Sequence, residues 1–409
     1  MKKFTFLTLP LLLSACAVGP DYQRPEPLPA ADTQLTEAQD NPVFTQGDPA
    51  GQWWHLFDDP VLDRLVEKAL KHNNDVRIAA ANLQRARALL AEAGAARLPT
   101  SSVSGSATQQ RTPGFGAGGL NGVSTDYYSV GFDASYEIDL FGRVSRSVEA
   151  ARADSASAQA GLDAARVSVA AETARTYADV CGFTAQASAA RETMELQQKT
   201  LDLTQRMLSG GRGTRRDVDQ ATVLVEQARA QAATYDAERR AAIYALAVLT
   251  GDPPAQADEA AAVCAVPPSL SQPIAVGDGQ ALLARRPDVR QAERTLAADT
   301  ARIGVATAQL YPSISLLGSV SLGAPDAGKL GSKQSLGYSV GPFVSFNFPF
   351  NGAARARVRE SKAVAEGSLA SFDKAVLTAL QETEQALARL SGALEREQSL
   401  QRAFAASED

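Results

Sequence analysis

The residue with the most specific chemistry in this sequence is Cys16. It follows two lysines, the apolar run Phe4–Leu13 and the small residues Ser14 and Ala15. The run is too short to anchor a protein permanently in a bilayer, so residues 1–15 are predicted to be a signal peptide. A Leu three positions before a Cys matches the bacterial lipobox, in which the thiol is diacylated and the freed amine is acylated after cleavage. The alternative is an ordinary signal peptide followed by an incidental Cys.

The predicted lipid on Cys16 would hold the mature chain firmly, because three acyl chains bind a membrane far more tightly than one. The next residue is Ala17 rather than Asp. By resemblance to enterobacterial lipoproteins, this favours sorting to the outer membrane. No later stretch has about twenty uninterrupted apolar residues, so no transmembrane helix is predicted after the signal. Any membrane-spanning part would therefore consist of strands.

The remaining nucleophiles and potential ligands form no catalytic or metal-binding pattern. Two His and three Cys are too few and too scattered for a metal cage, and His55 and His72 are predicted to be surface or packing residues. Cys181 and Cys264 are predicted to be free thiols in preference to a disulfide. No Ser/His/Asp set, phosphate loop or paired-carboxylate spacing stands out, so the sequence predicts a protein that is not an enzyme. The net charge of −6, without a basic stripe, argues against nucleic acid as a partner.

Three acidic residues, Asp133, Glu137 and Asp139, fall on one face of the segment Tyr127–Asp139. Polar and apolar residues alternate along this segment, which predicts a β-strand. If the polar face lines a lumen, several copies of the chain would form acidic rings that favour cations. The alternative is plain solvation of a wide lumen, with little selectivity. The apolar face consists of Tyr128, Val130, Phe132, Ala134, Tyr136 and Ile138.

Three further segments are predicted to be strands of the same kind: Thr100–Gln110, Ser313–Leu322 and Tyr338–Phe348. Apolar-out and polar-in alternation over about 9 to 11 residues is typical of an outer-membrane barrel. Taken alone, the pattern also fits a half-buried sheet in a soluble domain. Four strands cannot close a membrane barrel, and an open edge in lipid leaves unpaired backbone groups that cost several kcal/mol each. Other copies must complete the wall, and three copies would supply about 12 strands.

The strands belong to two copies of one pattern. Val76-Arg77 recurs as Val289-Arg290 at an offset of 213, and Tyr128–Gly131 recurs as Tyr338–Gly341 at an offset of 210. Each copy begins with a helix, continues through two strands and enters a long helix. The predicted organisation is a signal peptide (1–15), an extended N-terminal or equatorial segment (16–58), a first repeat (59–251), a Pro-rich linker (252–280) and a second, incomplete repeat (281–409).

Long helices must carry these strands. Residues 144–208 contain no Pro and few Gly, so one helix could extend about 95 Å at about 1.5 Å per residue. A glycine-rich turn then breaks the helix, and a return helix is predicted from Arg216 to Leu249. Frequent Ala on both helices permits close packing in a hollow α-helical barrel, and the alternative is a plain coiled-coil spacer. The turn contains Gly210, Gly211, Gly213 and Asp217.

Several motifs resemble those of the NodT-type outer-membrane efflux lipoproteins, relatives of TolC and OprM. Cys16–Pro25, with the sequence CAVGPDYQRP, resembles the mature N-terminus of this family. The resemblance continues through Trp53-Trp54, Tyr136–Arg143 (YEIDLFGR) and Arg285–Val289 (RRPDV). These motifs are spread over nearly the whole chain and are specific in combination. The two Trp residues are predicted to pack in an equatorial belt or to lie at the membrane interface.

This resemblance implies an α+β membrane fold built from a tandem structural repeat. A trimeric, 12-stranded β-barrel with four strands per chain would lie in the outer membrane of a Gram-negative bacterium and continue into a long periplasmic α-helical barrel. The turn with Gly210, Gly211, Gly213 and Asp217 would contact a periplasmic membrane-fusion adaptor. The structural alternative is a loop that simply needs φ > 0 at Gly. An inner-membrane pump of the resistance-nodulation-division type would be the second partner.

The function implied is that of a passive gated duct, which exports drugs or other small molecules and has no cofactor except the covalent lipid on Cys16. One alternative is the exit duct of a type I protein-secretion or metal-export system. The other is a non-conducting, lipid-anchored periplasmic coiled-coil tether, which would have no barrel strands.

The second repeat is shorter than the first. In the first copy, 78 residues follow Glu172 before the return helix ends, whereas only 27 residues follow the matching Glu382. About 50 residues are therefore expected to be missing, through truncation of the sequence or shortening of the gene product. They would form the lower half of one helix, its periplasmic turn and the return helix, which the resemblance implies would carry gate residues. Asn351 also replaces the Asp that is usual in the family's strand-to-helix turn, where Asn can serve equally well.

Overall fold

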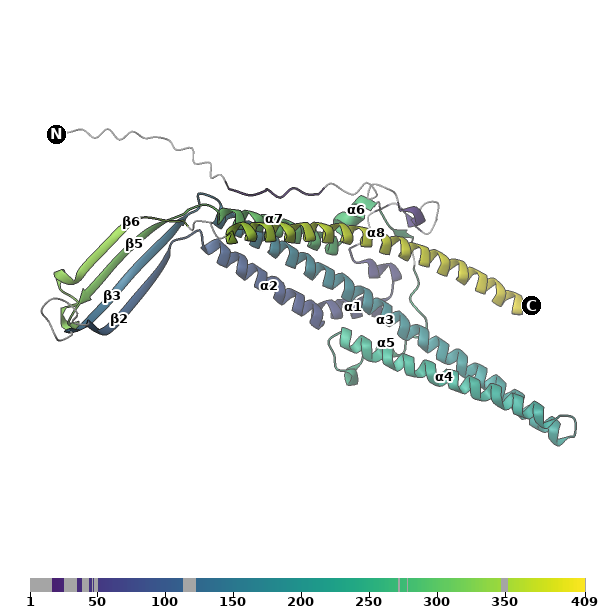
Figure 1. Cartoon of the computed structure of the whole chain (residues 1–409). Helices are drawn as coiled ribbons and strands as arrows, with labels where there is room; N and C mark the ends of the chain where they lie inside the picture. The colour runs from purple at the N-terminus through teal and green to yellow at the C-terminus, as the bar shows by residue number, and fades with distance from the viewer. Residues whose placement is uncertain are drawn as a thin grey trace. The chain divides into compact units, whose positions relative to one another are not determined.

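A computed structural model describes residues 17–25, 35–38, 44–45, 47, 51–112, 123–270, 273–277, 279–346 and 352–408 (Figure 1). Cys16 and Asn351 lie outside the described residues. The predicted order of helix, two strands and long helix occurs twice. The first copy consists of α2 (Asn74–Ala95), β2 (Thr100–Thr112), β3 (Val123–Ile138) and α3 (Arg143–Ser209). The second consists of α7 (Pro287–Ala308), β5 (Ser313–Ala324), β6 (Leu336–Ser345) and α8 (Ala353–Glu408).

The chain divides into two compact units. The first comprises the described residues of Met1–Glu26, Gln84–Ser157 and Gln291–Ala375, and the second comprises those of Pro27–Leu83, Ala158–Arg290 and Val376–Asp409. None of the helices in the described ranges combines the length and apolarity needed to cross a membrane.

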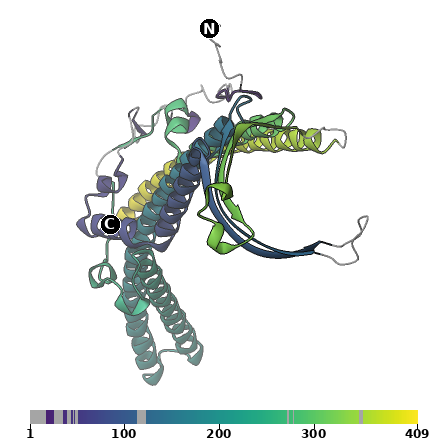
Figure 2. The same ribbon diagram turned by 90° about the vertical axis from the view of Figure 1, so that its left-hand side faces the viewer.

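In the first unit, the four strands form one antiparallel sheet in the order β2-β3-β5-β6, so the two repeats share a sheet. All four predicted strand segments are therefore confirmed, with boundaries shifted by a few residues, although positions 347 and 348 of the last segment lie outside the described residues. Figure 2 shows the strands lying side by side and bending along their length. Within the described sheet, β2 and β6 are the outer strands, and each has a neighbour on one side only. The short helices η5 (Ala327–Lys329) and η6 (Lys333–Ser335) connect β5 to β6.

The register of the sheet separates apolar and polar side chains onto opposite faces. Phe132 lies opposite Val103 and Val320, whereas Asp133 lies opposite two serines. The apolar side remains open to solvent in the described chain, since Tyr338 is 81% exposed. The apolar side chains of this face include Val103, Ala107, Tyr128, Val130, Phe132, Ala134, Tyr136, Ile138, Ile314, Leu316, Val320, Leu322, Leu336, Tyr338, Val340 and Val344.

The opposite face, which we call the polar face, carries mostly serine and glycine. The hydroxyl oxygens of Ser106 and Ser129 are 2.8 Å apart across β2 and β3, and those of Ser319 and Ser339 are 2.8 Å apart across β5 and β6. These hydroxyl pairs stabilise neighbouring strands on the side that lacks apolar contacts. Tyr127, Leu317 and Phe343 are the larger aromatic or apolar exceptions on this face.

A segment that we call the N-terminal strap, Ala17–Pro25, packs against α3 and α7 in the first unit. The Val18 N–H donates to the carbonyl oxygen of Phe141 at 3.2 Å. Gly19 has a φ of +95°, and a Cβ there would lie 2.5 Å from the Gly304 Cα. Only glycine at both positions allows the strap to approach the helix this closely.

Two buried charged side chains hold the strap. Arg146 of α3 is 6% exposed at its side chain and binds Asp21 of the strap at 2.5 Å. Glu293 of α7, also 6% exposed, accepts a hydrogen bond from the Tyr22 hydroxyl at 3.2 Å and lies 3.6 Å from the Arg24 Nε. Burial, together with the charge of Glu293, raises the pKa of Tyr22 to about 12. The strap therefore supplies partners for charges that would otherwise be costly to bury.

The second unit is built around α1 (Pro60–His72), the adjoining part of α3 and the return helix α4 (Arg215–Leu249). Leu62, Leu65 and Val66 of α1 are almost completely buried. They share a core with Trp54 of the short helix η3 (Trp53–Phe57), and Trp53 packs against that core. Both Trp residues therefore pack inside this unit, and their placement in an equatorial belt or at the membrane interface stays a prediction.

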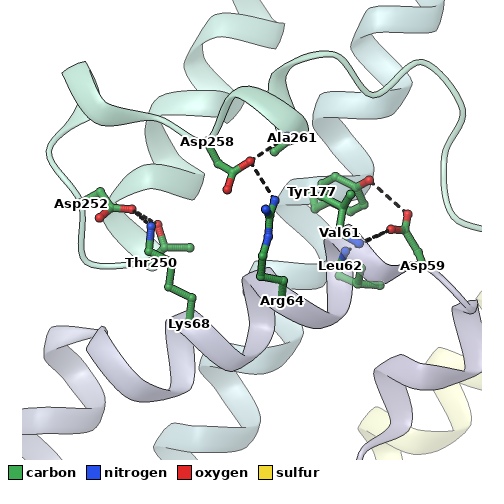
Figure 3. A network of polar contacts seen from close by, with 10 residues as sticks. All are labelled: Asp59, Val61, Leu62, Arg64, Lys68, Tyr177, Thr250, Asp252, Asp258 and Ala261. Carbon is green, nitrogen blue, oxygen red and sulfur yellow. Dashed lines mark hydrogen bonds and ion pairs between the residues drawn. The ribbon is translucent and has the colours of Figure 1, made fainter.

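Polar contacts fasten α1 to its neighbours (Figure 3). The Asp59 carboxylate caps α1 by accepting the Val61 N–H at 2.8 Å, and it also accepts the Tyr177 hydroxyl of α3 at 3.1 Å. Burial and the nearby charge of Asp59 raise the pKa of Tyr177. Further along α1, Lys68 binds Asp252 at 2.5 Å. These contacts fix α1 against α3 and against the segment that follows α4.

A second set of contacts joins the N-terminal segment, the linker and α8. The two-residue strands β1 (Phe44–Thr45) and β4 (Ile274–Ala275) pair in parallel. Glu384 of α8 accepts the N–H groups of Thr36 (2.6 Å) and Glu37 (3.1 Å), at the start of η2 (Thr36–Ala38). After the short helix α6 (Gly279–Arg285), Arg286 binds both Asp288 and Glu382. This segment and the linker are therefore held against α8.

The prediction of free thiols was wrong, because Cys181 and Cys264 form a disulfide. The predicted linker contains the short helices η4 (Pro254–Gln256) and α5 (Glu259–Ala262). Helix α5 brings its buried Ala261 into the same core as Cys181, and Cys264 follows two residues after the helix ends. The pairing therefore depends on how α5 folds back onto α3, which sequence spacing does not show.

Candidate functional site: the sheet–helix junction and the hairpin turn

Asp133 and Glu137 lie within β3 on the polar face, whereas Asp139 lies just beyond the strand. The Asp139 carboxylate accepts the N–H groups of Val144 at 2.9 Å and Ser145 at 2.7 Å. The first N–H groups of a helix have no partner inside it, so Asp139 stabilises the start of α3. Its position after an alternating strand made it resemble one more residue of the polar face.

Glu137 is paired with Arg143, the first residue of α3. The Arg143 Nε donates to one carboxylate oxygen of Glu137 at 2.8 Å, and Nη2 donates to the other oxygen. Hydrogen bonding to the Glu137 carboxylate in this bidentate pair raises the pKa of Arg143. Among the described residues, Asp133 is the one of the three predicted lumen-facing acids that neither joins an ion pair nor caps a helix.

A cavity of about 720 Å³ lies where the strands meet the long helices of the first unit. Glu137 and Asp139 line it together with Arg143 and Arg357. The Arg357 Nη1 donates to the side-chain oxygen of Gln309 at 3.1 Å. Phe141 and Tyr311 also line the cavity, and their rings stack with centroids 4.7 Å apart. The junction therefore presents balanced charges beside an aromatic pair.

The turn between α3 and α4 is a well-formed helix end. Gly211 has a φ of +71°, the left-handed conformation in which glycine is favoured. The N–H of Gly211 donates to the carbonyl oxygen of Leu208 at 3.0 Å, and the N–H of Arg212 donates to the carbonyl oxygen of Met207 at 2.8 Å. These two bonds form a Schellman motif, which gives partners to the last carbonyl groups of α3.

Asp217 caps the return helix. The Thr214 N–H donates to the Asp217 carboxylate at 2.9 Å, and the Asp217 N–H donates to the Thr214 hydroxyl oxygen at 3.3 Å. This capping box fixes the first turn of α4. The hydrogen bonds from the side chain and backbone of Thr214 lower the pKa of Asp217.

The structure brings the four predicted contact residues together in this turn. Gly210, Gly211 and Asp217 are exposed, and Gly213 is half-buried. Just behind the turn, Leu201 of α3 packs against Ala221 and Val225 of α4. The turn is therefore an exposed tip on a packed helical hairpin, with a geometry set by its own capping bonds.

Cys16 lies outside the described residues, so its lipidation stays a prediction. Sequence reasoning missed the two buried charges that receive the following strap, Arg146 and Glu293. Both occupy ordinary positions in helical segments, and only their distant partners show them to be special. The paired glycines at positions 19 and 304 are equally silent in the sequence.

The family model described as "Outer membrane efflux protein" matches residues 65–252 and 279–409 of the chain. Nodulation protein T of Rhizobium leguminosarum bv. viciae is 33% identical over 402 residues, which cover 96% of this chain and 80% of that protein. Outer membrane protein OprJ of Pseudomonas aeruginosa is 31% identical over 408 residues, which cover 98% of this chain and 83% of that protein.

Solved structures show the same similarity. The outer-membrane channel OprN superposes with a TM-score of 0.86 and 35% identity, covering 95% of this chain and 86% of that chain. The MtrE outer-membrane channel of Neisseria gonorrhoeae superposes with a TM-score of 0.76 and 28% identity, covering 95% of this chain and 85% of that chain.

Proposed function

The chain belongs to the family of outer membrane efflux proteins, and from this premise we propose how its sheet, long helices and hairpin turn carry out export. It is an outer-membrane channel subunit of a tripartite efflux system and extends from the outer membrane into the periplasm. The duct is passive and gated, and it carries drugs or other small molecules without catalysis or cofactor.

The observation that carries this proposal is the sheet with an exposed apolar face and two outer strands, each of which has a neighbour on one side only within the described residues. In lipid, unpaired strand edges are prohibitive, so β6 of one copy pairs with β2 of the next. Three copies close a 12-stranded barrel with the apolar face toward lipid and the polar face toward the lumen. The long helices of the three copies continue this wall as an α-helical barrel in the periplasm.

Fewer acidic side chains can act on ions in the lumen than the sequence suggested. Glu137 is neutralised by Arg143, and Asp139 is occupied by the N-terminus of α3. Among the described residues of the polar face, each copy then contributes Asp133 as its one unpaired carboxylate. A single ring of three such carboxylates gives a modest preference for cations.

Two neighbouring residues near the middle of β5 test the barrel. Val320 lies on the apolar face, opposite Phe132, and Ser319 lies on the polar face, opposite Asp133. Val320→Arg places a charge in lipid, at about 2–4 kcal/mol per copy near the midplane, and should abolish channels in planar bilayers. Ser319→Arg is the matched control, and it should still conduct while its preference shifts toward anions. Normal conductance of the Val320→Arg protein would refute this orientation of the sheet.

The exposed hairpin turn supports the proposal that two protein partners complete the system. A periplasmic membrane-fusion adaptor contacts Gly210, Gly211, Gly213 and the face around Asp217, and an inner-membrane pump of the resistance-nodulation-division type drives transport. A photocrosslinking side chain at Arg212 should capture the adaptor in intact cells, whereas one at Ser102 on the sheet should not. Equal capture at both positions would contradict adaptor docking at the turn.

The lipid proposal for Cys16 has a direct test. Mass spectrometry of the mature N-terminus should find a triacylated Cys, while the Cys16→Ser variant should retain its signal peptide or be cleaved elsewhere. An unmodified thiol at residue 16 of the wild-type protein would rule the proposal out.

A further inference from the structure

The disulfide between Cys181 and Cys264 closes a covalent ring at the base of the α3–α4 hairpin. The two residues are separated by 83 positions. The ring therefore contains the second part of α3, the turn, all of α4 and the short helix α5. Cys181 is 0% exposed, in the core that contains Tyr177 and Leu246, and Cys264 is half-buried against that core.

Non-covalent contacts position the linker beside α3 independently of the bond. The Asp258 carboxylate accepts a hydrogen bond from the Arg64 guanidinium of α1 at 3.1 Å. It also accepts one from the Ala261 N–H at 3.1 Å and thereby caps α5. Arg239 of α4 donates to the carbonyl oxygen of Ala262 at 3.2 Å. These contacts lie within six residues of Cys264 along the chain. Folding of this unit therefore brings the two thiols together, and oxidation then fixes the arrangement.

We propose that the chain is a substrate of a disulfide-bearing thiol oxidase of the periplasm, which joins Cys181 to Cys264 at the hairpin base. An outer-membrane protein passes through this compartment, where disulfides persist. The third cysteine, Cys16, is acylated under the function proposed above, on which this step of the argument rests, so its sulfur is a thioether that does not exchange. Only one pairing then remains, and no isomerase is needed.

The exposure of the two sulfurs sets the order of attack. Cys264 is the more accessible of the two and reacts first: its thiolate attacks one sulfur of the oxidant's disulfide, forms a mixed disulfide and releases one oxidant thiolate. The Cys181 thiolate then attacks the Cys264 sulfur, forms the intramolecular bond and displaces the second oxidant thiolate. The two cysteines lose two protons and two electrons, and the oxidant becomes a dithiol.

A matched pair of variants tests this order. Each is produced in cells whose periplasmic oxidase lacks its own second cysteine, so that mixed disulfides cannot be resolved by the oxidase. Cys181→Ala retains the accessible thiol and should accumulate the mixed disulfide, seen as a reducible gel shift. Cys264→Ala retains only the buried thiol and should accumulate at least tenfold less. Equal trapping of the two variants, or trapping of neither, would overturn the proposal.

A mass-tagged maleimide, applied to denatured wild-type protein, counts the free thiols. Protein from an oxidising envelope should take up no tag before reduction and two tags after it, whereas protein from oxidase-deficient cells should take up two tags without reduction. Two tags on unreduced protein from the oxidising envelope would overturn the proposal, and a third tag would report an unacylated Cys16.

Conductance of the same samples separates the two proposals. Protein that conducts but lacks the bond counts against the disulfide alone. Protein that has the bond but forms no channel counts against the barrel alone.

Discussion

Replacing Gly304 with Ala isolates the contribution of the N-terminal strap. A Cβ at residue 304 would lie 2.8 Å from the Arg146 Cγ, 2.9 Å from its Cδ and 3.0 Å from the Val18 carbonyl oxygen. Favourable carbon–carbon contacts lie at about 3.5–4.0 Å. The Arg146 side chain cannot move aside freely, because it is 6% exposed and its guanidinium binds Asp21 and Glu149. The strap must therefore lift or the helix must shift.

The magnitude follows from two opposing effects. Ala is better than Gly inside a helix by about 0.8–1 kcal/mol, and overpacking a close contact costs about 1–3 kcal/mol. The Gly304→Ala protein should therefore be up to about 2 kcal/mol less stable than wild type. Gly367 of α8 is a matched control, because a Cβ there meets nothing within 4 Å. Gly367→Ala should be stabilised by about 0.8–1 kcal/mol, so the gap between the two variants reports the close approach.

Two assays read this gap. Denaturant unfolding of the detergent-solubilised proteins measures the difference in stability between the variants. Hydrogen exchange measures opening of the strap at the Val18 amide, where a loss of about 1–3 kcal/mol corresponds to exchange about 5- to 150-fold faster. The reasoning is refuted if Gly304→Ala and Gly367→Ala stabilise the protein equally and exchange at Val18 does not change.

Three further predictions concern the second unit. Asp59→Ala removes the cap of α1 and the acceptor of the Tyr177 hydroxyl, so the free energy of unfolding should fall by about 1–3 kcal/mol. In thermal melts, Asp59→Asn should recover part of this loss. Equal melting of the Asp59→Ala protein and the wild type would contradict the cap. The hydrogen bond from Lys68 lowers the pKa of Asp252 below its usual value of 3.8, so this contribution is present above about pH 4 and disappears as the pH falls through the lowered pKa. Asp252→Asn should flatten that acid-induced loss in pH-dependent unfolding, and an unchanged acid profile would exclude the pair as its source. Leu65→Ala removes most of a side chain that is 0% exposed and should lower the free energy of unfolding by about 3–5 kcal/mol in denaturant. A loss below about 1 kcal/mol would show that Leu65 is not packed as described.

The strands and long helices could be predicted from the sequence because their signals are local. Alternation along Tyr127–Ile138 reports two faces wherever the strand lies, and the Pro-free stretch from residue 144 to residue 208 reports one helix. The strand order could not be derived in this way. β3 pairs with β5 from the other repeat, and nothing local to Phe132 indicates that Val320 lies opposite it.

The glycines were enough to locate the hairpin turn in the sequence. The contacts of Glu137 and Asp139 at the sheet–helix junction could not be predicted in the same way. The alternation of polar and apolar residues continues through Asp139, because this helix-capping residue follows Glu137 by two positions, as the next residue of the polar face would. The disulfide was missed for a related reason. Cys181 and Cys264 meet only because α5 folds onto a core shared with α1 and α3, and such a long-range contact leaves no mark in the spacing of two cysteines.

The serines and glycines of the polar face bear on the flow of cargo through the proposed duct. Side chains this short occupy little of the cross-section, so the water column beside the sheet stays broad and offers low hydraulic and electrical resistance. Larger side chains on the same face include those of Tyr127, Leu317 and Phe343, and at the sheet–helix junction the long charged side chains of Arg143 and Arg357 line the cavity. The serines therefore add little to any narrowing of the duct, and trimming them to alanine would leave throughput almost untouched.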